Sequence, residues 1–225
     1  MSLATEINHT FTIGHIEITY AWSYAAKGDG HACMDHYRQA VYFMEPLKAV
    51  NWLGQAYTGI GQACYFLGRY EEAVGYIEKG MEIQSRAGSL TWRARQYLYL
   101  GLVYLEMGDM TKASRNAEEA LALARKIAEK DHEAYSKILL GRVAVREEKS
   151  RLDEAERNVL DGIRILKDQR QKPDVAVGYL SLAELYLDAG QNEKALQPVR
   201  KAEAMFREMG MDQWLKKAQE VLAKL

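Results

Sequence analysis

The sequence predicts an all-α protein: a right-handed superhelix, or α-solenoid, of five helix pairs followed by a C-terminal capping helix. Small residues recur forty positions apart at Ala21, Gly61, Gly101 and Gly141, and a fifth copy of the pattern follows at Ala183. Apolar residues recur at spacings of three and four, which is the period of one helix face, and the chain has only three prolines. A fixed period of this length is typical of arrays in which each helix pair packs on its neighbours.

The period divides the chain into five repeats and a cap, which we expect to form one solenoid domain over residues 4–225. The predicted repeats cover approximately residues 8–46, 47–88, 89–130, 131–171 and 173–210, and the cap covers residues 212–225. Residues 1–3 look like a vector-derived start, which would make the chain a piece of a longer protein.

Each repeat is predicted to be two helices joined by a tight turn. In the second repeat the first helix carries Trp52, Ala56 and Ile60 on one face and ends at Gly68, and acidic residues then open the second helix, where they suit the helix dipole. The second helices share a small residue near their start, which in order is Cys33, Ala73, Ala113, Ala155 and Ala195. The fourth repeat has two extra residues before this position, and Pro198 is expected to kink the second helix of the fifth repeat or to delay its start.

The repeats resemble tetratricopeptide repeats (TPRs), because small residues stand at two helix crossings, an aromatic residue lies between them and a glycine marks the turn. The small residues let helix backbones approach, and the aromatic residue, here Tyr24, Tyr104 or Tyr186, fills the adjacent space. An earlier aromatic position holds Glu17 in the first repeat and Lys137 in the fourth, so these two repeats are divergent. The forty-residue period exceeds the usual TPR length of about 34 and implies longer helices, as in the TPR arrays of bacterial signal-transduction ATPases.

The last third of the chain carries a narrower resemblance. It is similar to the C-terminal TPR region of large bacterial class III adenylate/guanylate cyclases that carry an ATPase module, in the segment 179–186, at Gly190 and Ala195, in the segment 204–211 and at Trp214. The resemblance implies a sensing or docking arm of a larger signalling protein. It implies no catalysis, because the chain holds no cyclase or nucleotide-binding segment.

Charge and composition argue against several classes of partner. Thirty lysines and arginines oppose 31 acidic residues, which argues against a general attraction to nucleic acid or to an anionic membrane. No run approaches the ~20 apolar residues of a membrane helix, and the N-terminus lacks a secretory pattern. Two cysteines without metal-binding spacing favour a reducing compartment, which we interpret as the cytoplasm.

The sequence offers few residues for chemistry. It has no GxxxxGK[ST] phosphate loop and no recognisable set of nucleophile, base and orienting residue, so we expect no enzyme activity and no cofactor. A dense group of metal-binding residue types does occur at His31, Cys33, Asp35 and His36. Only His31 and Asp35 share a helix face, which leaves a tetrahedral zinc site incomplete. We therefore interpret these residues as solvent-facing residues at the start of a helix and predict no metal site.

The concave face lined by the first helices is the usual binding surface of TPR arrays, and the resemblance assigns its lining to fixed positions in each repeat. The predicted partner-binding residues are His15, Trp22, Gln55, Thr58, Gln62, Tyr65, Arg95, Glu106, Tyr135, Arg142, Arg146, Glu184 and Asp188. Aromatic residues and arginines dominate interface energetics, and Arg95, Arg142 and Arg146 form a basic strip suited to a carboxylate or an acidic segment. Alternatively, Tyr65 packs between repeats and the arginines point outward into solvent.

The leading hypothesis is a protein-binding or peptide-binding scaffold, the regulatory arm of a larger bacterial signalling protein. Its partner would be a protein or peptide in the concave groove, and neither nucleic acid nor a membrane. The alternative is a small-molecule sensing module of a signal-transduction ATPase or transcriptional regulator, with a metabolite in the groove. Self-association through the terminal repeats is a third hypothesis.

Overall fold

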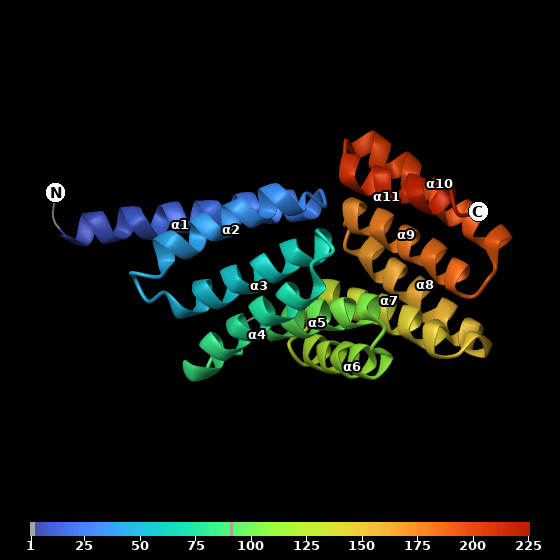
Figure 1. Cartoon of the computed structure of the whole chain (residues 1–225), viewed down its shortest axis with the longest axis horizontal. Helices are drawn as coiled ribbons and strands as arrows, with labels where there is room; N and C mark the ends of the chain where they lie inside the picture. The colour runs from blue at the N-terminus through green and yellow to red at the C-terminus, as the bar shows by residue number, and fades with distance from the viewer. Residues whose placement is uncertain (1–2, 91) are drawn as a thin grey trace. The chain divides into compact units, whose positions relative to one another are not determined.

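A computed structural model describes residues 3–90 and 92–225, with side chains in these ranges from residue 9 onward. Over these ranges the chain contains eleven α-helices, one 3₁₀ turn and no strand (Figure 1). The elements are α1 (Leu3–Ala26), α2 (Gly30–Met44), α3 (Val50–Phe66), α4 (Tyr70–Arg86), α5 (Arg93–Met107), α6 (Met110–Lys126), α7 (Lys130–Glu147), η1 (Lys149–Arg151), α8 (Leu152–Asp168), α9 (Lys172–Asp188), α10 (Asn192–Met209) and α11 (Asp212–Leu222). The predicted all-α fold is confirmed. None of these described helices is both long and apolar enough to cross a membrane.

The chain forms two compact units, Met1–Val103 and Tyr104–Leu225, with the boundary inside α5. In the N-terminal unit α1 packs on α2 and α3 packs on α4, and in the C-terminal unit α7 packs on α8 and α9 packs on α10 (Figure 1). A last helix, α11, packs on α10 and α9. The single domain over residues 4–225 and the boundaries of the repeats stay predictions.

Most of the turns within pairs depend on a glycine in the left-handed conformation, which costs other residues strain. Gly68 (φ 71°) follows α3 and Gly108 (φ 82°) follows α5. The turn between α7 and α8 is different: Glu148 is extended (φ −151°), and η1 leads into α8. This 3₁₀ turn accommodates the two extra residues that the sequence shows before Ala155.

Small residues occupy the crossings between paired helices. A Cβ atom added to Gly61 would lie 2.5 Å from Cγ1 of Ile77, and one added to Gly141 would lie 2.6 Å from the carbonyl oxygen of Ala155. Real Cβ atoms do not approach so closely, so these helices cross at a distance that only glycine allows. The predicted small residues near the start of the second helices are all fully buried: Cys33, Ala73, Ala113, Ala155 and Ala195.

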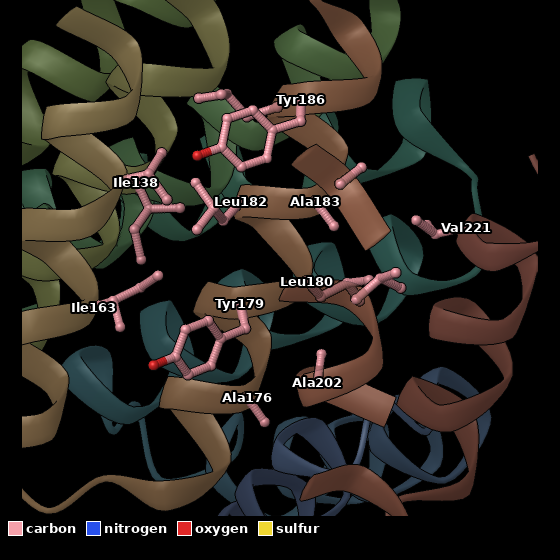
Figure 2. Packing of buried hydrophobic residues seen from close by; sticks show 14 of the residues in the cluster. Ile138, Ile163, Ala176, Tyr179, Leu180, Leu182, Ala183, Tyr186, Ala202 and Val221 are labelled. Atoms are coloured by element: carbon pink, nitrogen blue, oxygen red, sulfur yellow. The ribbon is translucent and has the colours of Figure 1, made fainter. Parts of the chain in front are cut away.

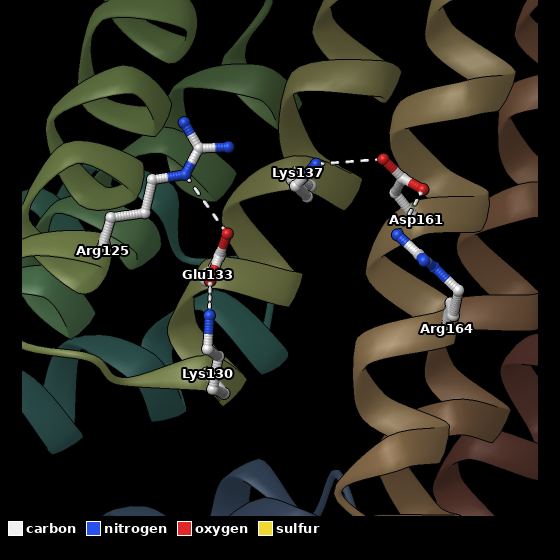
Figure 3. A network of polar contacts seen from close by, with 6 residues as sticks. All are labelled: Arg125, Lys130, Glu133, Lys137, Asp161 and Arg164. Carbon is white, nitrogen blue, oxygen red and sulfur yellow. Dashed lines mark hydrogen bonds and ion pairs between the residues drawn. The ribbon is translucent and has the colours of Figure 1, made fainter.

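The earlier aromatic position of the repeat, which holds Glu17 in the first repeat and Lys137 in the fourth, makes another contact between paired helices. In two pairs the contact is a lysine over a tyrosine ring, Lys79 over Tyr57 (3.9 Å to the centroid) and Lys201 over Tyr179 (4.3 Å). In the divergent pairs charged residues replace this contact. Glu17 pairs with His36 (2.7 Å), and Lys137 pairs with Asp161 (3.1 Å; Figure 3). The divergent repeats therefore keep an attraction between their helices and change only its chemistry.

The core of the C-terminal unit lies around α9. Figure 2 shows Leu180 and Leu182 of α9 between Ile138 and Ile163 on one side and Val221 on the other. All five side chains are buried, so α9 is covered by α7 and α8 and by the C-terminal helices. Burial of this apolar surface is the main stabilising contribution to the unit.

The C-terminal helix caps this core through an aromatic contact. The ring of Trp214 on α11 stacks on the fully buried ring of Phe206 on α10, with centroids 6.0 Å apart. Pro198 lies inside α10 and is buried, and α10 nevertheless begins at Asn192. The predicted delay of the helix start is therefore wrong, because the packing of the proline ring in the core offsets the hydrogen bond that its missing N–H costs.

Candidate functional site

A polar cluster forms in the N-terminal unit where a side chain from α2 crosses α3. Gln55, Gly59 and Gln62 lie on one face of α3, because they are separated by four and three residues. The ring of Tyr37 from α2 fills the space beside Gly59, where an added Cβ atom would lie 2.1 Å from Cζ of the ring. Since Cζ carries the hydroxyl group, the polar end of Tyr37 reaches the backbone of α3 at this glycine.

Arg95 connects this face of α3 to α5. Its Nη2 donates a hydrogen bond to Oε1 of Gln62, and Nε2 of Gln62 donates one to the hydroxyl oxygen of Tyr99. The Arg95 guanidinium carbon lies 5.7 Å from the centroid of the Tyr99 ring, within the range of a cation–π contact. Just before α5, the ring of Trp92 lies 6.0 Å from that of Trp22 on α1. We call this group the Arg95 cluster: Trp22, Tyr37, Gln62, Trp92, Arg95 and Tyr99.

The structure thus brings Trp22, Gln62 and Arg95 together from the predicted residues, and it adds Tyr37, Trp92 and Tyr99, which the predicted lining did not include. Tyr37 was missed because it belongs to a second helix, whereas the predicted lining came from first helices alone. The sequence did carry a signal for it: Gly59 stands outside the repeated small positions and leaves room for a crossing side chain.

Burial keeps the acidic groups around Arg95 neutral. It raises the pKa of the Tyr37 hydroxyl to about 12, against the opposing effect of Arg95, and it also raises the pKa of Tyr99. Burial raises the thiol pKa of Cys33, one helical turn before Tyr37, to about 12. All three groups act on Arg95, which also makes a side-chain hydrogen bond with Tyr37, and Arg95 has no ion pair with a carboxylate in the described part of the chain. Arg95 therefore holds a positive charge without a counter-charge.

Among the described residues, both amide atoms of Gln55 have no hydrogen-bond partner. The Tyr37 hydroxyl, in contrast, is approached by the side chains of Arg95 and Trp22, whose hydrogen bonds oppose the rise of its pKa. Tyr37 is fully buried and Gln55 is 2% exposed. A buried group without a partner costs about 1–3 kcal/mol, so native proteins nearly always pair such groups with protein, water or a ligand.

Thr58 lies in a different environment from the Arg95 cluster. Its side chain is 2% exposed, and its hydroxyl donates to the carbonyl oxygen of Gly54 (2.8 Å). The amide of Gln96 donates to Thr58 Oγ1 (3.0 Å) and to Oε1 of Gln84 (2.7 Å). Thr58 is therefore part of a buried network between helices, one that includes Gln84 and Gln96, which the sequence analysis did not single out.

His15 and Tyr65 make aromatic contacts. His15 packs edge-on against Trp52, with ring centroids 4.5 Å apart. Tyr65 borders the Arg95 cluster, because its ring lies 6.4 Å from that of Tyr99, and it also contacts Phe66 (5.7 Å). Both side chains are partly buried, and the alternative that Tyr65 packs between repeats agrees with these contacts.

In the C-terminal unit the predicted charged residues form a network. Arg142 is 4% exposed and lies between Glu106 (3.3 Å) and Glu184 (3.1 Å). Arg146 pairs with Asp188 (2.8 Å), and its Nη1 donates to the carbonyl oxygen of Leu105 (3.0 Å). The outward, solvated orientation is therefore wrong for Arg142.

The charges of this network are balanced within the unit. Lys217 of the capping helix approaches Glu184 (3.6 Å), so three basic groups meet three carboxylates. Burial alone would raise the pKa of Glu184, but Arg142, Lys217 and Arg146 outweigh it and hold that pKa below its usual range. Arg142 and Arg146 thus differ from Arg95, because their charge is already neutralised by the chain itself.

Tyr135 lies beside Asp174, another partly buried group of the C-terminal unit. Burial raises the pKa of the Asp174 carboxyl, and a hydrogen bond with Tyr135 opposes that shift.

The group of metal-binding residue types near the start of α2 is dispersed. Cys33 is fully buried in its small-residue position, whereas His31 and Asp35 are exposed. His36 turns to Glu17, and its ring stacks on Tyr24 (5.2 Å). Across residues 9–90 and 92–225, no three histidine, cysteine or acidic side chains converge as a metal site would require.

Comparison with known proteins places this helical array in a family. The family model described as the MalT-like TPR region matches residues 14–225. The chain belongs to this family. The resemblance to TPRs is thereby confirmed, and the narrower resemblance to cyclase-associated arrays stays a prediction. None of the curated proteins compared with the chain matches it.

Solved structures show the same fold at low sequence identity. The chain is similar to aspartyl phosphate phosphatase F from Bacillus subtilis (TM-score 0.73, 15% identity, covering 88% of this chain and 50% of that chain). It is also similar to the apo form of RapI (TM-score 0.62, 14% identity, 95% and 84%) and to BtubC from P. vanneervenii (TM-score 0.57, 17% identity, 93% and 93%). The chain spans half the length of aspartyl phosphate phosphatase F, and at these identities the likeness establishes the fold alone.

Proposed function

We propose that this chain is a non-catalytic TPR module that binds a peptide or an extended protein segment, and that the face of α3 and α5 in the N-terminal unit is a principal contact surface. The observation that carries the proposal is the buried side chain of Gln55, both of whose amide atoms have no partner among the described residues. A bound partner would supply the missing hydrogen bonds.

The chemistry of this face suits a peptide. A peptide backbone offers a carbonyl acceptor and an N–H donor at each residue, and the amide of Gln55 can pair with both. Trp22 and Tyr99 supply the large aromatic surfaces that dominate binding energy at interfaces, and Gln62 is held in place by its two hydrogen bonds. The face therefore combines fixed polar groups with apolar contact area.

The titratable groups of the same face favour binding over catalysis. A thiol acts as a nucleophile only as the thiolate, and burial holds the Cys33 thiol protonated at neutral pH. Tyr37 is likewise held protonated. We propose no reaction for this site.

The place of the module in a larger system is also proposed. The chain spans only half of aspartyl phosphate phosphatase F, which is compatible with a regulatory arm attached to further domains of a bacterial signalling protein. Both cysteines are free and buried, which suits the cytoplasm, where thiols stay reduced.

Selection of peptides from a random display library, followed by affinity measurements, tests the proposal. Selected peptides should bind the Gln62→Ala variant at least about tenfold more weakly, because its contacts to Arg95 and Tyr99 position the face. Gln39→Ala, an exposed residue of α2, is the matched control and should bind normally. Equal loss in both variants, or no loss in either, would contradict the assignment of the surface.

A screen of metabolites by thermal shift distinguishes the alternative. A small molecule at a hundred times its dissociation constant stabilises a protein by about 2.7 kcal/mol. Such a shift with a neutral metabolite, combined with failure to select any peptide, would replace the proposal by the small-molecule sensor.

A further inference from the structure

The helix α1 has the composition of a helix from the interior of the array. Between His9 and Ala26 its only acidic or basic residue besides histidine is Glu17, which pairs with His36 of α2 (2.7 Å). The helix α3 likewise carries no lysine, arginine or acidic residue, and it is buried along most of its length between α2 and α4. A helix that is apolar on all sides is typically covered on all sides.

One face of α1 is nevertheless exposed. Its exposed residues recur at spacings of three and four, so they share one side of the helix. Ile16 is 46% exposed and Tyr20 is 54% exposed. We call this side the outer face of α1, and it consists of His9, Thr12, Ile16, Thr19, Tyr20, Ser23 and Ala26. None of these residues is a lysine, an arginine or an acid.

The outer face of α1 corresponds to the face by which α3 packs on the preceding helix pair. In the forty-residue period Thr19 corresponds to Gly59, against which the ring of Tyr37 from α2 lies. Ser23 corresponds to Ala63, whose carbonyl oxygen would lie 3.1 Å from a Cβ atom added to the first residue of α2. The outer face of α1 is therefore a repeat-to-repeat contact face that is exposed to solvent.

The burial of equivalent residues supports this assignment. Ile16 corresponds to Ala56, which is fully buried, and Tyr20 corresponds to Ile60, which is 3% exposed. The C-terminal helix α11 is different, because it exposes charged side chains at Asp212, Lys216 and Glu220, as a capping helix does. The outer face of α1 thus lacks the polar surface that closes the array at α11.

The start of α1 indicates where a covering helix would come from. The helices α3 and α7 begin at Val50 and Lys130, and each follows the preceding helix through a short loop, residues 45–49 and 127–129. In the forty-residue period both starts correspond to residue 10, whereas α1 begins at Leu3. The residues that would form such a loop are helical in α1, which favours a covering helix from another molecule.

The outer face is suited to pack on a copy of itself. If two α1 helices pack antiparallel about a two-fold axis near Thr19, Ile16 of one copy lies opposite Ser23 of the other, so that large side chains meet small ones. The hydroxyls of Thr19 and Ser23 already donate to the carbonyl oxygens of His15 (3.0 Å) and Thr19 (3.2 Å), so neither loses a hydrogen bond on burial. Because the face carries no lysine, arginine or acid, such residues cannot repel each other across it.

We propose that the outer face of α1 is a dimer interface, in which α1 packs antiparallel on α1 of a second copy of this chain, with Ile16 and Tyr20 as the central apolar contacts. Both copies use the same patch, so the assembly closes at two chains. The inference goes beyond the proposed function, because it concerns a different face from that of α3 and α5, and either can fail without the other.

Sedimentation equilibrium of the chain tests the dimer. Between about 1 μM and about 1 mM protein the mass should rise from 25.6 kDa towards twice that value, because a dimer with a dissociation constant in this range is partly formed. A mass that stays at 25.6 kDa throughout would overturn the proposal and leave the outer face of α1 to a different occupant. Growth beyond two chains would also overturn it, because a two-fold interface closes.

A charged variant assigns the dimer to the outer face. Ile16→Glu places two carboxylates in the apolar interface and should weaken dimerisation at least about 100-fold, with helicity unchanged by circular dichroism. Leu160→Glu is the matched control, because Leu160 on α8 is 43% exposed, and it should leave the dissociation constant within about twofold. Equal weakening in both variants, or no weakening in either, would contradict the assignment.

A cross-linking variant tests the two-fold arrangement independently of charge. In the proposed dimer the thiols of Thr19→Cys lie near the axis, so a short bismaleimide should join two chains. Gly75→Cys, in open space on α4, should not cross-link, and the parent chain gives the background from the two buried native cysteines. If Thr19→Cys is dimeric by sedimentation but cross-links no better than Gly75→Cys, the antiparallel packing of α1 on α1 is wrong.

Discussion

Arg95 and Arg142 both stand on the first helices of their pairs, yet the structure predicts effects of different size on stability when their charge is removed. The test replaces each by methionine, which keeps an unbranched apolar stem of similar length. The free energy of unfolding at pH 7 is the quantity compared. The difference depends only on whether the charge has a partner in the folded chain.

The expected loss of unfolding free energy is large for Arg142→Met. Its side chain is 4% exposed and contacts Glu106 at 3.3 Å and Glu184 at 3.1 Å. Removing one partner of a buried ion pair typically costs 3–5 kcal/mol, because the remaining charge stays buried. Lys217 remains 3.6 Å from Glu184, and Arg146 remains 3.9 Å from Glu106, so part of the charge is still compensated. We therefore expect a loss near the lower limit, about 3 kcal/mol.

The expected loss of unfolding free energy is small or absent for Arg95→Met. Removing Arg95 leaves no carboxylate without its counter-charge. Arg95→Met therefore removes a partly buried cation together with its desolvation cost, and it also removes the hydrogen bond to Gln62. A neutral-to-charged hydrogen bond contributes about 1.5–3 kcal/mol, and relief of the unpaired charge opposes this term. We expect a net change within about 1 kcal/mol of the parent protein, with an increase in stability as the more informative result.

Urea unfolding followed by circular dichroism and by tryptophan fluorescence measures both variants. Arg38→Met in the N-terminal unit and Arg115→Met in the C-terminal unit are the controls, because both arginines are exposed. If the two units unfold in separate transitions, each variant is judged by the transition of its own unit. A loss below about 1 kcal/mol for Arg142→Met, together with a loss above about 2 kcal/mol for Arg95→Met, would refute the reasoning from charge balance.

Three further predictions concern packing and titration. Gly61→Val should cost at least about 1–3 kcal/mol of unfolding free energy, because even a Cβ atom there overlaps a neighbouring side chain. Gly75 on α4 faces open space, so Gly75→Ala should stabilise the protein by about 0.5–1 kcal/mol. Urea unfolding of both variants measures the two changes. Cys33 should react with a thiol reagent at pH 8 only as fast as the unit opens, since burial raises its pKa to about 12, and reaction at the rate of a free thiol would contradict its buried position. The C-terminal unit should lose stability as the pH falls from about 5 towards 2. A hydrogen bond with His132 lowers the pKa of Asp131 to about 2, and the pKa of Glu184 is also lowered, so both carboxylates contribute stability above an unfolded pKa near 4. Unchanged unfolding free energy across that pH range would contradict this.

The positions of helices and turns could be predicted because they depend on local residues. Gly68 and Gly108 supply left-handed turns wherever they occur, and Gly61 and Gly141 permit close crossings for the same stereochemical reason. The local rule that Pro198 would delay the start of its helix failed, because burial of the ring in the core offsets the local cost. Local rules hold until packing between helices provides a larger free energy.

The candidate site could be predicted only in part. The repeat places Trp22, Gln62 and Arg95 on first helices, but it carries no information about Tyr37, which reaches the site from α2. The ion pairs of the C-terminal unit have a clearer signal in the sequence. Glu106 lies 36 residues before Arg142, close to one repeat, and opposite charges at that separation on neighbouring first helices could have indicated a pair.

The sequence by itself determined that this protein is an all-helical array of TPR type, because a forty-residue period and small residues at crossings are properties of the chain that any packing must satisfy. Only the tertiary structure decided which arginines are neutralised and which is not. Charge pairing depends on distances of about 3–4 Å between side chains on different helices, and the period specifies a helix face without specifying those distances. Arg142 contacts two carboxylates, whereas Arg95 contacts the ring of Tyr99 and the amide of Gln62.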